Sequence, residues 1–376
     1  MSEEPFRVVI AGGGVAGLEA ALALRDLAEN RVSIELIAPE HDFVYRPLAV
    51  AEPFRVADTR SFPLAALVDD AGASLRRGRV AAVDLGGHAV ELPDGGRVDY
   101  DALLVALGAQ ASEAVPGALT FAGPKSSDAV RAVLDEILAG EVHRIAFALP
   151  SGVTWSLPLY ELALLTANFA VDHMAGGVEV AVVTPEDRPL ALFGDQASEA
   201  VVELLEQAGV ELHLETTPVE FAGGELRIAP GGSITAERTV ALPRLEGPRL
   251  PGLPCDRDGF ISIDSRFRVG SEVDVFAAGD ATQYPLKQGG IAAQQADTAA
   301  EHIAALAGAP VEPEPFKPVF RGLLLTGMVP RYLRGEAGGR ESAVDTEALW
   351  WPPAKISGRY LAPFLASRLG LASVSA

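Results

Sequence analysis

The chain has 376 residues, of which 49% are hydrophobic and 22% are charged, and its formal net charge is −21. This length predicts two or three domains with buried cores, and the composition is typical of a globular protein rather than a disordered or membrane-spanning one. The negative charge argues against nucleic acid as a partner, because most of the surface would repel phosphates.

Two further features of the sequence limit where in the cell the protein is expected and which cysteine chemistry it can use. No apolar run reaches the ~20 residues needed to cross a bilayer, and residues 1–5 lack the basic start and apolar core of a signal peptide. We therefore expect a cytoplasmic protein. A single cysteine, Cys255, excludes an internal disulfide and a C-x-x-C pair.

A glycine-rich turn lies between the first apolar run, residues 8–10, and an alanine- and leucine-rich helical pattern. Gly12 would allow the tight turn, Gly14 the close approach of the backbone to a pyrophosphate, and Gly17 the packing of helix on strand. The phosphates would face the amides at the start of the helix. The pattern predicts a dinucleotide site, with a ligand-free βα turn as the alternative.

The second predicted strand, residues 33–40, should end with an acidic side chain that binds the adenosine ribose. The usual position for this side chain is Ala38. Glu40 is the nearby substitute, and an exposed loop glutamate is an equally good interpretation of it. Short alternating strands with turns at 86–87 and 94–96 are then expected between residues 78 and 100.

Two later segments turn this dinucleotide site into a flavin site. Residues 100–109 (YDALLVALGA) and 274–281 (DVFAAGDA) resemble the "YDxLvxAtGa" and "vfAaGD" segments of flavoproteins related to the pyridine nucleotide-disulfide oxidoreductases. The resemblance implies FAD as the cofactor and a bond from Asp280 to the flavin ribityl chain. Leu107 replaces the family threonine, and a turn or helix N-cap aspartate is the alternative for Asp280.

The same resemblance implies an α/β fold with two Rossmann-like dinucleotide-binding domains, arranged as in glutathione reductase, in which the second domain splits the FAD domain. The expected boundaries are 1–115 and 249–309 for the two parts of the FAD-binding domain, and 116–248 for a degenerate NAD(P)-type domain. The proline-rich linker 310–315 then leads into a small C-terminal α+β region, giving a piece that spans 310–376.

The second domain lacks the fingerprint of a nicotinamide site. After its first predicted strand, residues 143–149, the chain has a single glycine in 150–163 (PSGVTWSLPLYELA). The side chains of Trp155 and Leu157 and the neighbouring proline rings would crowd a pyrophosphate and remove amide donors. Ordinary NAD(P) binding is therefore not expected.

Together with residues 178–186 and 194–197, this segment is similar to the branch of sulfide:quinone oxidoreductase and flavocytochrome c sulfide dehydrogenase. In that branch a "CPPxPYE"-like stretch carries a redox cysteine over the flavin, and Trp155 occupies the cysteine position here. The resemblance therefore implies that the disulfide chemistry is lost. Cys255 is expected to be an ordinary loop cysteine, because a lone thiol has no partner for exchange.

Residues 41–48 and 285–295 complete the expected flavin surroundings. The first segment resembles "hfvyxPL", whose proline, here Pro47, lies beside the isoalloxazine; Arg46 pairs either with FAD phosphates or with a surface carboxylate. The second resembles the helix whose positive end faces the flavin pyrimidine edge, where Lys287 adds charge unless it is a solvated loop lysine. Glu161 and Tyr160 are candidates for proton transfer, with a glutamate paired to a basic group as the alternative.

The expected catalytic residues are thus Lys287, Glu161 and Tyr160, and no metal site is expected. The expected FAD contacts are Gly12, Gly14, Ala16, Gly17, Glu40, Arg46, Pro47, Val80, Ala106, Gly108, Gly279, Asp280, Gly290 and Ile291.

The last segment considered, 350–369, combines aromatic and basic residues, with apolar residues at helical spacing from Ile356 to Leu365. It is either a peripheral membrane contact, as in quinone-reducing relatives, or a helix docked on the FAD domain or on a partner in a homodimer. Gly358 and Pro363 would shorten such a helix.

Three functions are compatible with these features. The favoured hypothesis is an FAD-dependent oxidoreductase that passes electrons from an unidentified small-molecule donor to a quinone or another small acceptor, without cysteine-based sulfide chemistry. The alternatives are a type II-like NAD(P)H dehydrogenase and a non-enzymatic flavin-binding protein whose site is closed by Trp155.

Overall fold

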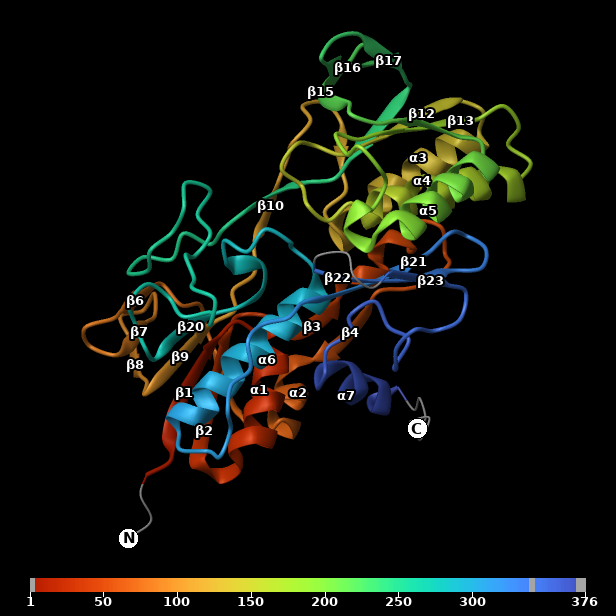
Figure 1. Cartoon of the computed structure of the whole chain (residues 1–376). Coiled ribbons are helices and arrows are strands. Elements are labelled where there is room, and N and C mark those ends of the chain that lie inside the picture. The colour runs from red at the N-terminus through yellow and green to blue at the C-terminus, as the bar shows by residue number, and fades with distance from the viewer. Residues whose placement is uncertain (1–3, 338–341, 370–376) are drawn as a thin grey trace.

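The computed structural model describes residues 4–337 and 342–369, and it contains two α/β units and a smaller C-terminal piece (Figure 1). Each unit is built on a parallel five-stranded sheet with helices packed against it. The predicted α/β fold with two Rossmann-like domains is therefore confirmed.

The first sheet has the order β20-β9-β1-β2-β5, and all neighbouring strands are parallel. Val8 and Ile10 face one side, where they join the core formed with the helices α1 and α6, while Val9 and Ala11 face the other side. Burial on both faces explains why β1 is a continuous apolar run. The strands of this sheet are β1 (Phe6–Ala11), β2 (Val32–Ala38), β5 (Ser74–Arg77), β9 (Ala102–Val105) and β20 (Val275–Ala277).

Helices and a small antiparallel sheet cover the two faces of this first sheet. The helices are α1 (Val15–Ala28), α2 (Leu64–Asp70) and α6 (Gly289–Leu306), and α1 and α6 lie side by side in Figure 1. The opposite face contacts the antiparallel strands β6 (Ala82–Asp84), β7 (Ala89–Glu91) and β8 (Arg97–Asp99), as the sequence predicts for residues 78–100. A two-stranded pair, β3 (Asp42–Tyr45) and β4 (Arg60–Pro63), lies between β2 and α2 in the chain.

The second sheet, with the order β11-β18-β12-β13-β14, is also entirely parallel. Its strands are β11 (Leu119–Thr120), β12 (Arg144–Ala148), β13 (Glu179–Val183), β14 (Val210–His213) and β18 (Arg238–Ala241). The helices of this unit are α3 (Ser127–Leu138), α4 (Leu157–Asp172) and α5 (Asp195–Gln207). The other face contacts the antiparallel strands β15 (Thr217–Ala222), β16 (Glu225–Ala229) and β17 (Ser233–Thr235), where Leu226 is fully buried.

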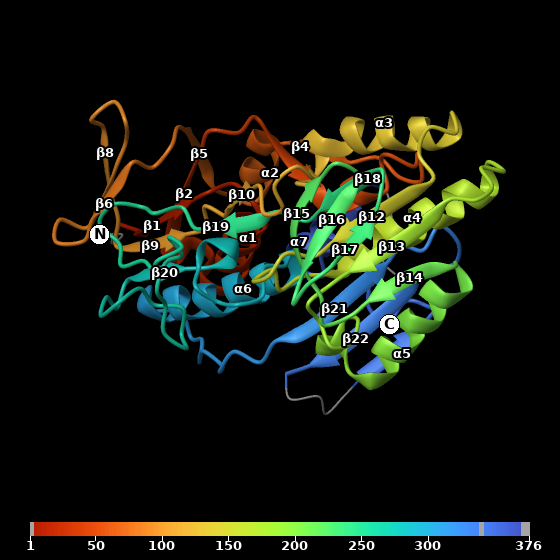
Figure 2. The same cartoon turned by 90° about the horizontal axis from the view of Figure 1, so that it is seen from above.

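The chain leaves the first unit through β10 (Gln110–Ser112) and returns through β19 (Arg244–Glu246), which pair with each other (Figure 2). The first sheet therefore takes four strands from before this excursion and its edge strand β20 from after it. The exact limits at 115, 248 and 309 remain sequence-based predictions.

The C-terminal piece contacts both units. Its antiparallel sheet of β21 (Val319–Leu324), β22 (Arg331–Glu336) and β23 (Ser342–Asp345) packs on the second unit, where Gly322 lies against Leu157 and Phe193. Its helix α7 (Leu361–Arg368) packs on the first unit, and Leu361 and Leu365 belong to the core around α1 and α6.

This helix begins later than the apolar spacing from Ile356 predicts. The Glu19 carboxylate accepts hydrogen bonds from the N–H groups of Tyr360 and Leu361, each at 2.7 Å. A Cβ on Gly358 would lie 2.3 Å from Glu19 Oε2, so the chain needs glycine to approach α1 this closely. Segment 350–369 thus matches the docked-helix interpretation, because Ile356, Leu361 and Leu365 are buried in the core of the first unit, while Trp351 is 45% exposed.

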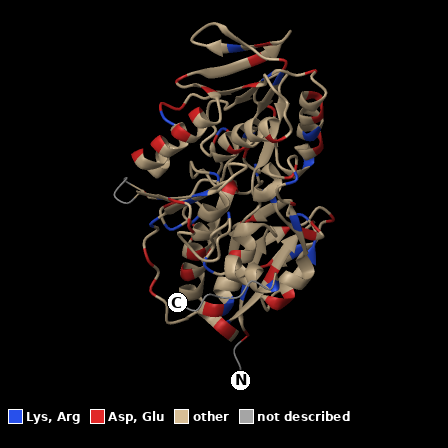
Figure 3. Ribbon diagram, turned by 90° about the vertical axis from the view of Figure 1, so that its right-hand side faces the viewer, with Lys and Arg blue, Asp and Glu red and all other residues tan. Residues whose placement is uncertain are grey.

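None of the helices in the described ranges is long and apolar enough to cross a membrane. Asp and Glu residues occur on the outer helices of both units (Figure 3), in keeping with the net charge of −21.

Candidate flavin site

The glycine turn after β1 is packed so tightly that side chains are excluded at two positions. Gly12 has a φ of +117°, and a Cβ there would lie 2.3 Å from the Ala106 carbonyl oxygen. A Cβ on Gly17 would lie 2.0 Å from the Gly12 oxygen. The Ala106 N–H donates to Ala11 O at 2.7 Å, which fixes the β9 end beside this turn. These contacts give the expected strand-turn-helix geometry of a dinucleotide site.

Gly14 differs from its neighbours because its missing side chain faces open space. No described heavy atom lies within 4 Å of a Cβ built there. Gly14 is the N-cap of α1, and within the described residues neither a capping side chain nor an acidic residue in the first turn occupies this helix start. The turn therefore offers amides and space to an anion, which fits the pyrophosphate of FAD.

Other predicted contacts lie at the same edge of the first sheet, beyond the carboxyl ends of its strands. Glu40 is exposed two residues after β2, whereas Ala38 is buried. Val80 follows β5, and Gly108, with a φ of +70°, follows β9. This edge is where α/β sheets bind their ligands. The contacts of these residues with FAD remain predictions.

Gly279 and Asp280 follow the edge strand β20 and lie between α1 and α6. Gly279 has a φ of +76°, and its missing Cβ would lie 3.2 Å from that of Ala16 and 3.3 Å from that of Ala292. The Asp280 carboxylate has no hydrogen bond to another described residue, and burial raises its pKa while Lys287 and Arg46 lower it. A carboxylate that lacks a protein donor in this position fits the flavin ribityl hydroxyls.

Asp280 does not cap helix α6. That role belongs to Gln288, whose side chain accepts a hydrogen bond from the Ile291 N–H at 2.7 Å. Asp280 is therefore not the N-cap of α6.

Lys287 is half-buried rather than freely solvated. Its Nζ donates to the Thr282 carbonyl oxygen and lies 3.8 Å from the centroid of the Phe260 ring. Burial lowers the pKa of Lys287 to about 8, opposed by the charges of Asp280 and Asp256. The lysine can thus change its charge near neutral pH beside the predicted flavin edge.

The C-terminal segment covers the start of α6. A Cβ on Gly289 would lie 3.0 Å from Ile356 Cγ1, and one on Gly290 would lie 3.2 Å from Ser357 Oγ. The Ile356 N–H donates to the Tyr45 hydroxyl at 2.8 Å, directly before Arg46 and Pro47. Residues 41–48 and 285–295, which were both expected around the flavin, therefore meet the C-terminal segment here.

Glu161 is fully buried and paired with a lysine. Lys355 Nζ lies 2.5 Å from Oε1 and 2.6 Å from Oε2 of Glu161, and the Leu325 N–H also donates to Oε1, at 2.8 Å. Burial raises the pKa of Glu161 and lowers that of Lys355, and the attraction between the two opposes both changes. This geometry is that of the alternative interpretation, a glutamate paired with a basic group.

Tyr160 is also bound within the second unit. Its hydroxyl donates to Glu186 Oε2 at 2.5 Å, and Ser156 Oγ donates to Glu186 Oε1 at 2.7 Å. Thr184 Oγ1 donates to the same carboxylate at 3.0 Å. Glu186 lies just beyond β13, at the position equivalent to that of Glu40 beyond β2.

The loop 150–156 contacts the segment before Lys287 through Thr154 and the second unit through Trp155. Thr154 Oγ1 donates to the Pro285 carbonyl oxygen at 2.6 Å, in the segment that leads to Lys287. The Trp155 ring packs edge-on against Phe193, with centroids 6.0 Å apart. The loop therefore connects the second unit to the predicted flavin edge, while Trp155 contributes to packing within the second unit.

Cys255 lies among the residues that pack under β6–β8, paired with Ile261 in an isolated β-bridge. Burial raises the pKa of its thiol, and the neighbouring Asp256 acts in the same direction.

In the part of the chain that the structure describes, no group of three or more His, Cys, Asp or Glu side chains is suited to hold a metal ion.

Sequence reasoning did not single out Lys355, Thr154 or Glu186. Glu186 carried a usable signal, because an acidic residue after the second strand of a Rossmann-like unit is itself a recognised pattern. Lys355 and Thr154 carried none, since their partners Glu161 and Pro285 are remote in the sequence.

Comparisons with known proteins agree with this geometry. Residues 6–301 match the family model described as pyridine nucleotide-disulphide oxidoreductase. Rhodocoxin reductase from Rhodococcus erythropolis is 28% identical over 295 residues, which cover 74% of this chain and 65% of the relative. The ferredoxin reductase component of chlorobenzene dioxygenase from Cupriavidus sp. (strain PS12) is 27% identical over 300 residues, covering 75% of this chain and 68% of the relative. The chain thus spans about two thirds of the length of these curated relatives.

Two solved structures share the fold. The sulfide:quinone oxidoreductase of Aquifex aeolicus matches with a TM-score of 0.79 at 17% identity, covering 91% of this chain and 87% of the other. The ferredoxin reductase for the CYP199A2 system of Rhodopseudomonas palustris matches with a TM-score of 0.65 at 21% identity, covering 89% of this chain and 83% of the other. The family match over residues 6–301, on a fold whose glycine turn fits FAD, places the chain in the pyridine nucleotide-disulphide oxidoreductase family of FAD-dependent oxidoreductases.

Proposed function

We propose that this chain passes electrons from a donor other than NAD(P)H or a thiol, through FAD, to a quinone or another small acceptor. The observation that carries the proposal is the loop 150–156. In its place a nicotinamide enzyme would have the glycine turn that receives a pyrophosphate.

The contacts of this loop oppose nucleotide binding. Ser156 and Tyr160 both donate to Glu186, so the acidic group that would bind a ribose is already occupied. Glu40, at the equivalent position in the first unit, is exposed. The two units therefore differ in the way expected if one holds FAD and the other holds no dinucleotide.

Thiol chemistry is not supported either. The residue at the position of the relatives' redox cysteine is Trp155, and Cys255 has a pKa raised by burial. A thiol that stays protonated is a poor nucleophile, and a single thiol cannot cycle through an internal disulfide.

The residues around the predicted flavin edge have separable tasks. When bound, FAD supplies the capacity to accept and release electrons. The amides at Gly14 would hold its phosphates, and Asp280 would orient the ribityl chain. Lys287 and the positive end of α6 favour negative charge at the pyrimidine edge.

The buried pair of Glu161 and Lys355 is our candidate for handling the protons that quinone reduction consumes. Lys355 directly precedes Ile356, which packs on the start of α6 at Gly289. Burial brings the pKa values of the two groups toward each other, which makes proton transfer between them less costly. The proposal thus gives Glu161 a proton-transfer role through its lysine partner.

A nicotinamide-dependent reductase is the second candidate function. It is favoured by the names of the curated relatives, one of which is a ferredoxin--NAD(+) reductase component at 27% identity. In this case the loop 150–156 would have to open and Glu186 would have to exchange its hydroxyl partners for a ribose.

Reoxidation of the reduced flavin tests the first candidate. The holoprotein is photoreduced without oxygen and mixed with a short-chain quinone, and the return of the visible flavin band is followed. We expect rapid reoxidation that slows about tenfold or more in Lys355→Met, because general acid catalysis commonly contributes ~10²–10⁴ in rate. Lys317→Met, which changes an exposed lysine of the linker region, should react like the unmodified protein. Absence of reoxidation by quinone, or equal rates in the two variants, would contradict the proposal.

A further inference from the structure

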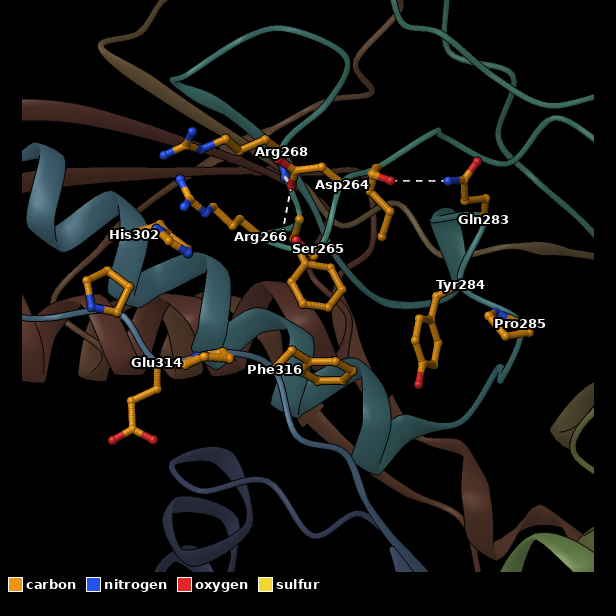
Figure 4. Close-up of a pocket in the computed structure, with 14 residues that line it drawn as sticks. Asp264, Ser265, Arg266, Arg268, Gln283, Tyr284, Pro285, His302, Glu314 and Phe316 are labelled. Carbon is orange, nitrogen blue, oxygen red and sulfur yellow. Dashed lines mark hydrogen bonds between the residues drawn. The ribbon is translucent and has the colours of Figure 1, made fainter. Parts of the chain in front are cut away.

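A large cavity lies outside the flavin cradle, beside the edge strand β20. It has a volume of about 950 Å³ and is lined by residues 263–268, 283–285 and 313–316 together with His302 of α6 (Figure 4). Arg268 pairs with Phe276 of β20 in an isolated bridge, which places the cavity at that edge of the first sheet. The glycine turn at Gly12 follows β1, two strands away, so the two places are distinct.

Aromatic side chains form one wall of the cavity. The rings of Phe267 and Phe316 meet edge to face, with centroids 4.9 Å apart and planes at 87°. Tyr284 and Phe316 do the same at 5.7 Å and 89°. Phe267 is buried, whereas Tyr284 and Phe316 are partly exposed and leave ring surface for a further planar group.

Cationic side chains occupy another part of the wall. Figure 4 shows Arg266, Arg268 and His302 on the same side of the cavity, with the Glu314 carboxylate pointing away from them. Neither guanidinium group has an ion pair with a carboxylate of the described residues, and the buried Nε of Arg268 has no hydrogen-bond acceptor among them. Burial, and then the charges of Arg268 and Arg266, lower the pKa of His302. Both arginines therefore lie close enough to His302 to disfavour its protonated form.

The Asp264 carboxylate, which also lines the cavity, is bound by main-chain N–H groups and not by these guanidinium groups. Asp264 Oδ1 accepts hydrogen bonds from the main-chain N–H groups of Arg266 and Arg268, at 2.8 Å and 2.9 Å. The carboxylate therefore stabilises its own turn. In a chain of net charge −21, two guanidinium groups that have no carboxylate partner among the described residues line one cavity, which makes this cavity suited to an anionic ligand.

We propose that this cavity binds a small anion carrying an aromatic ring, with its carboxylate or phosphate on Arg266 and Arg268 and its ring against Tyr284 and Phe316. The volume is within the usual ~300–1,000 Å³ of small-molecule sites. Arginine is the side chain best suited to carboxylate and phosphate, because its N–H groups match their two oxygens.

The cavity also shares a segment with the flavin site. Gln283 Nε2 donates to Ile263 O at 3.1 Å inside the lining, and Pro285 O accepts from Thr154. A bound ligand would therefore contact the segment that leads to Lys287. The inference does not depend on which electron donor or acceptor the chain uses.

Calorimetric titration of the FAD-loaded protein tests the site without an activity assay. The probes are 1-naphthoate, AMP, inorganic phosphate and the uncharged 2-naphthylmethanol. We expect at least one aromatic anion to bind at least tenfold more tightly than phosphate or the uncharged ring. The comparison of 1-naphthoate with AMP distinguishes a carboxylate ligand from a phosphate ligand.

Three variants assign the binding to the cavity. Arg266→Gln with Arg268→Gln should weaken the aromatic anion at least tenfold, while Arg257→Gln should not change it, because Arg257 is 93% exposed and outside the lining. Phe316→Leu should weaken the aromatic anion but leave phosphate unchanged, and FAD content and far-UV circular dichroism check that each variant folds. The proposal is overturned if no probe binds, if phosphate binds as tightly as the aromatic anions, or if the double variant binds like Arg257→Gln.

Discussion

Replacement of Lys355 leaves the buried Glu161 carboxylate without its cationic partner, so we expect a large loss in the free energy of unfolding. The Glu161 side chain is fully buried and that of Lys355 is 7% exposed, with their atoms 2.5 and 2.6 Å apart. Loss of one partner from such a pair costs about 3–5 kcal/mol, because the remaining charge is left unpaired in a poorly solvated place. In Lys355→Met, Glu161 keeps only the Leu325 N–H as a donor. We expect a loss at the lower end of this range, since protonation of Glu161 relieves part of the penalty.

The sign of the pH dependence follows from the raised pKa of Glu161. Burial raises this pKa, and the opposing effect of Lys355 is absent from the variant. A folded-state pKa above the unfolded one means that the carboxyl stabilises fully below the unfolded value of about 4.3 and loses this effect as the pH rises through the folded value. The stability deficit of Lys355→Met should therefore be small at pH 4–5 and grow toward neutral pH.

Urea unfolding of the FAD-loaded protein, followed by far-UV circular dichroism, measures this effect. Lys355→Met combined with Glu161→Gln should recover most of the loss at pH 7, because no buried charge remains. The matched control is Arg7→Gln, which removes an exposed partner of Asp101 at 2.8 Å and should cost only about 0–1 kcal/mol. A loss below about 1 kcal/mol in Lys355→Met, or a double variant no more stable than the single one, would refute the reasoning.

Three further predictions concern the cofactor, the thiol and Asp297, a residue of helix α6 whose carboxyl lies beside that of Glu19. Gly14→Leu should fold but contain no FAD when its flavin is quantified after purification, because a side chain there enters the open space that we expect the FAD phosphates to occupy; a fully loaded variant would contradict this. Cys255→Ser should leave turnover unchanged, and a loss of about tenfold, worth ~1.4 kcal/mol in the barrier, would show that the thiol takes part. Burial, and then the charge of Glu19, raises the pKa of Asp297 to about 9, so the contribution of this carboxyl to the free energy of unfolding is full below about pH 4 and slopes downward as the pH rises toward about 9. Asp297→Asn should flatten this slope in urea unfolding, and an equally steep slope in the variant would count against the assignment.

The parts of the fold that were predictable depend on local patterns. The turn at Gly12, the apolar strand β1 and the short strands β6–β8 each follow from residues within a few positions of one another. The core helix α6 was expected from the resemblance of residues 285–295 to a helix of the family. These local signals agree with the family resemblance, and the fold class was therefore recoverable from the chain alone.

The parts that were not predictable depend on contacts between distant residues. At the start of α7, the Glu19 carboxylate of α1 accepts hydrogen bonds from the N–H groups of Tyr360 and Leu361. Gly358 indicated a shortened helix, but no residue near it indicated that Glu19 is the partner. The partner of Glu161 lies 194 positions away at Lys355. The cavity at Arg266 and Arg268 combines four separate parts of the chain, which no periodicity could bring together.

Anaerobic titration of the FAD-loaded protein with NADH, followed at the visible flavin band, tests the proposed function most directly. The loop 150–156 is bound to Glu186 and Pro285 and lacks the three-glycine turn for a pyrophosphate. We therefore predict that micromolar NADH leaves the flavin oxidised over minutes. Rapid, stoichiometric bleaching at micromolar NADH would contradict this and establish a nicotinamide-dependent reductase instead.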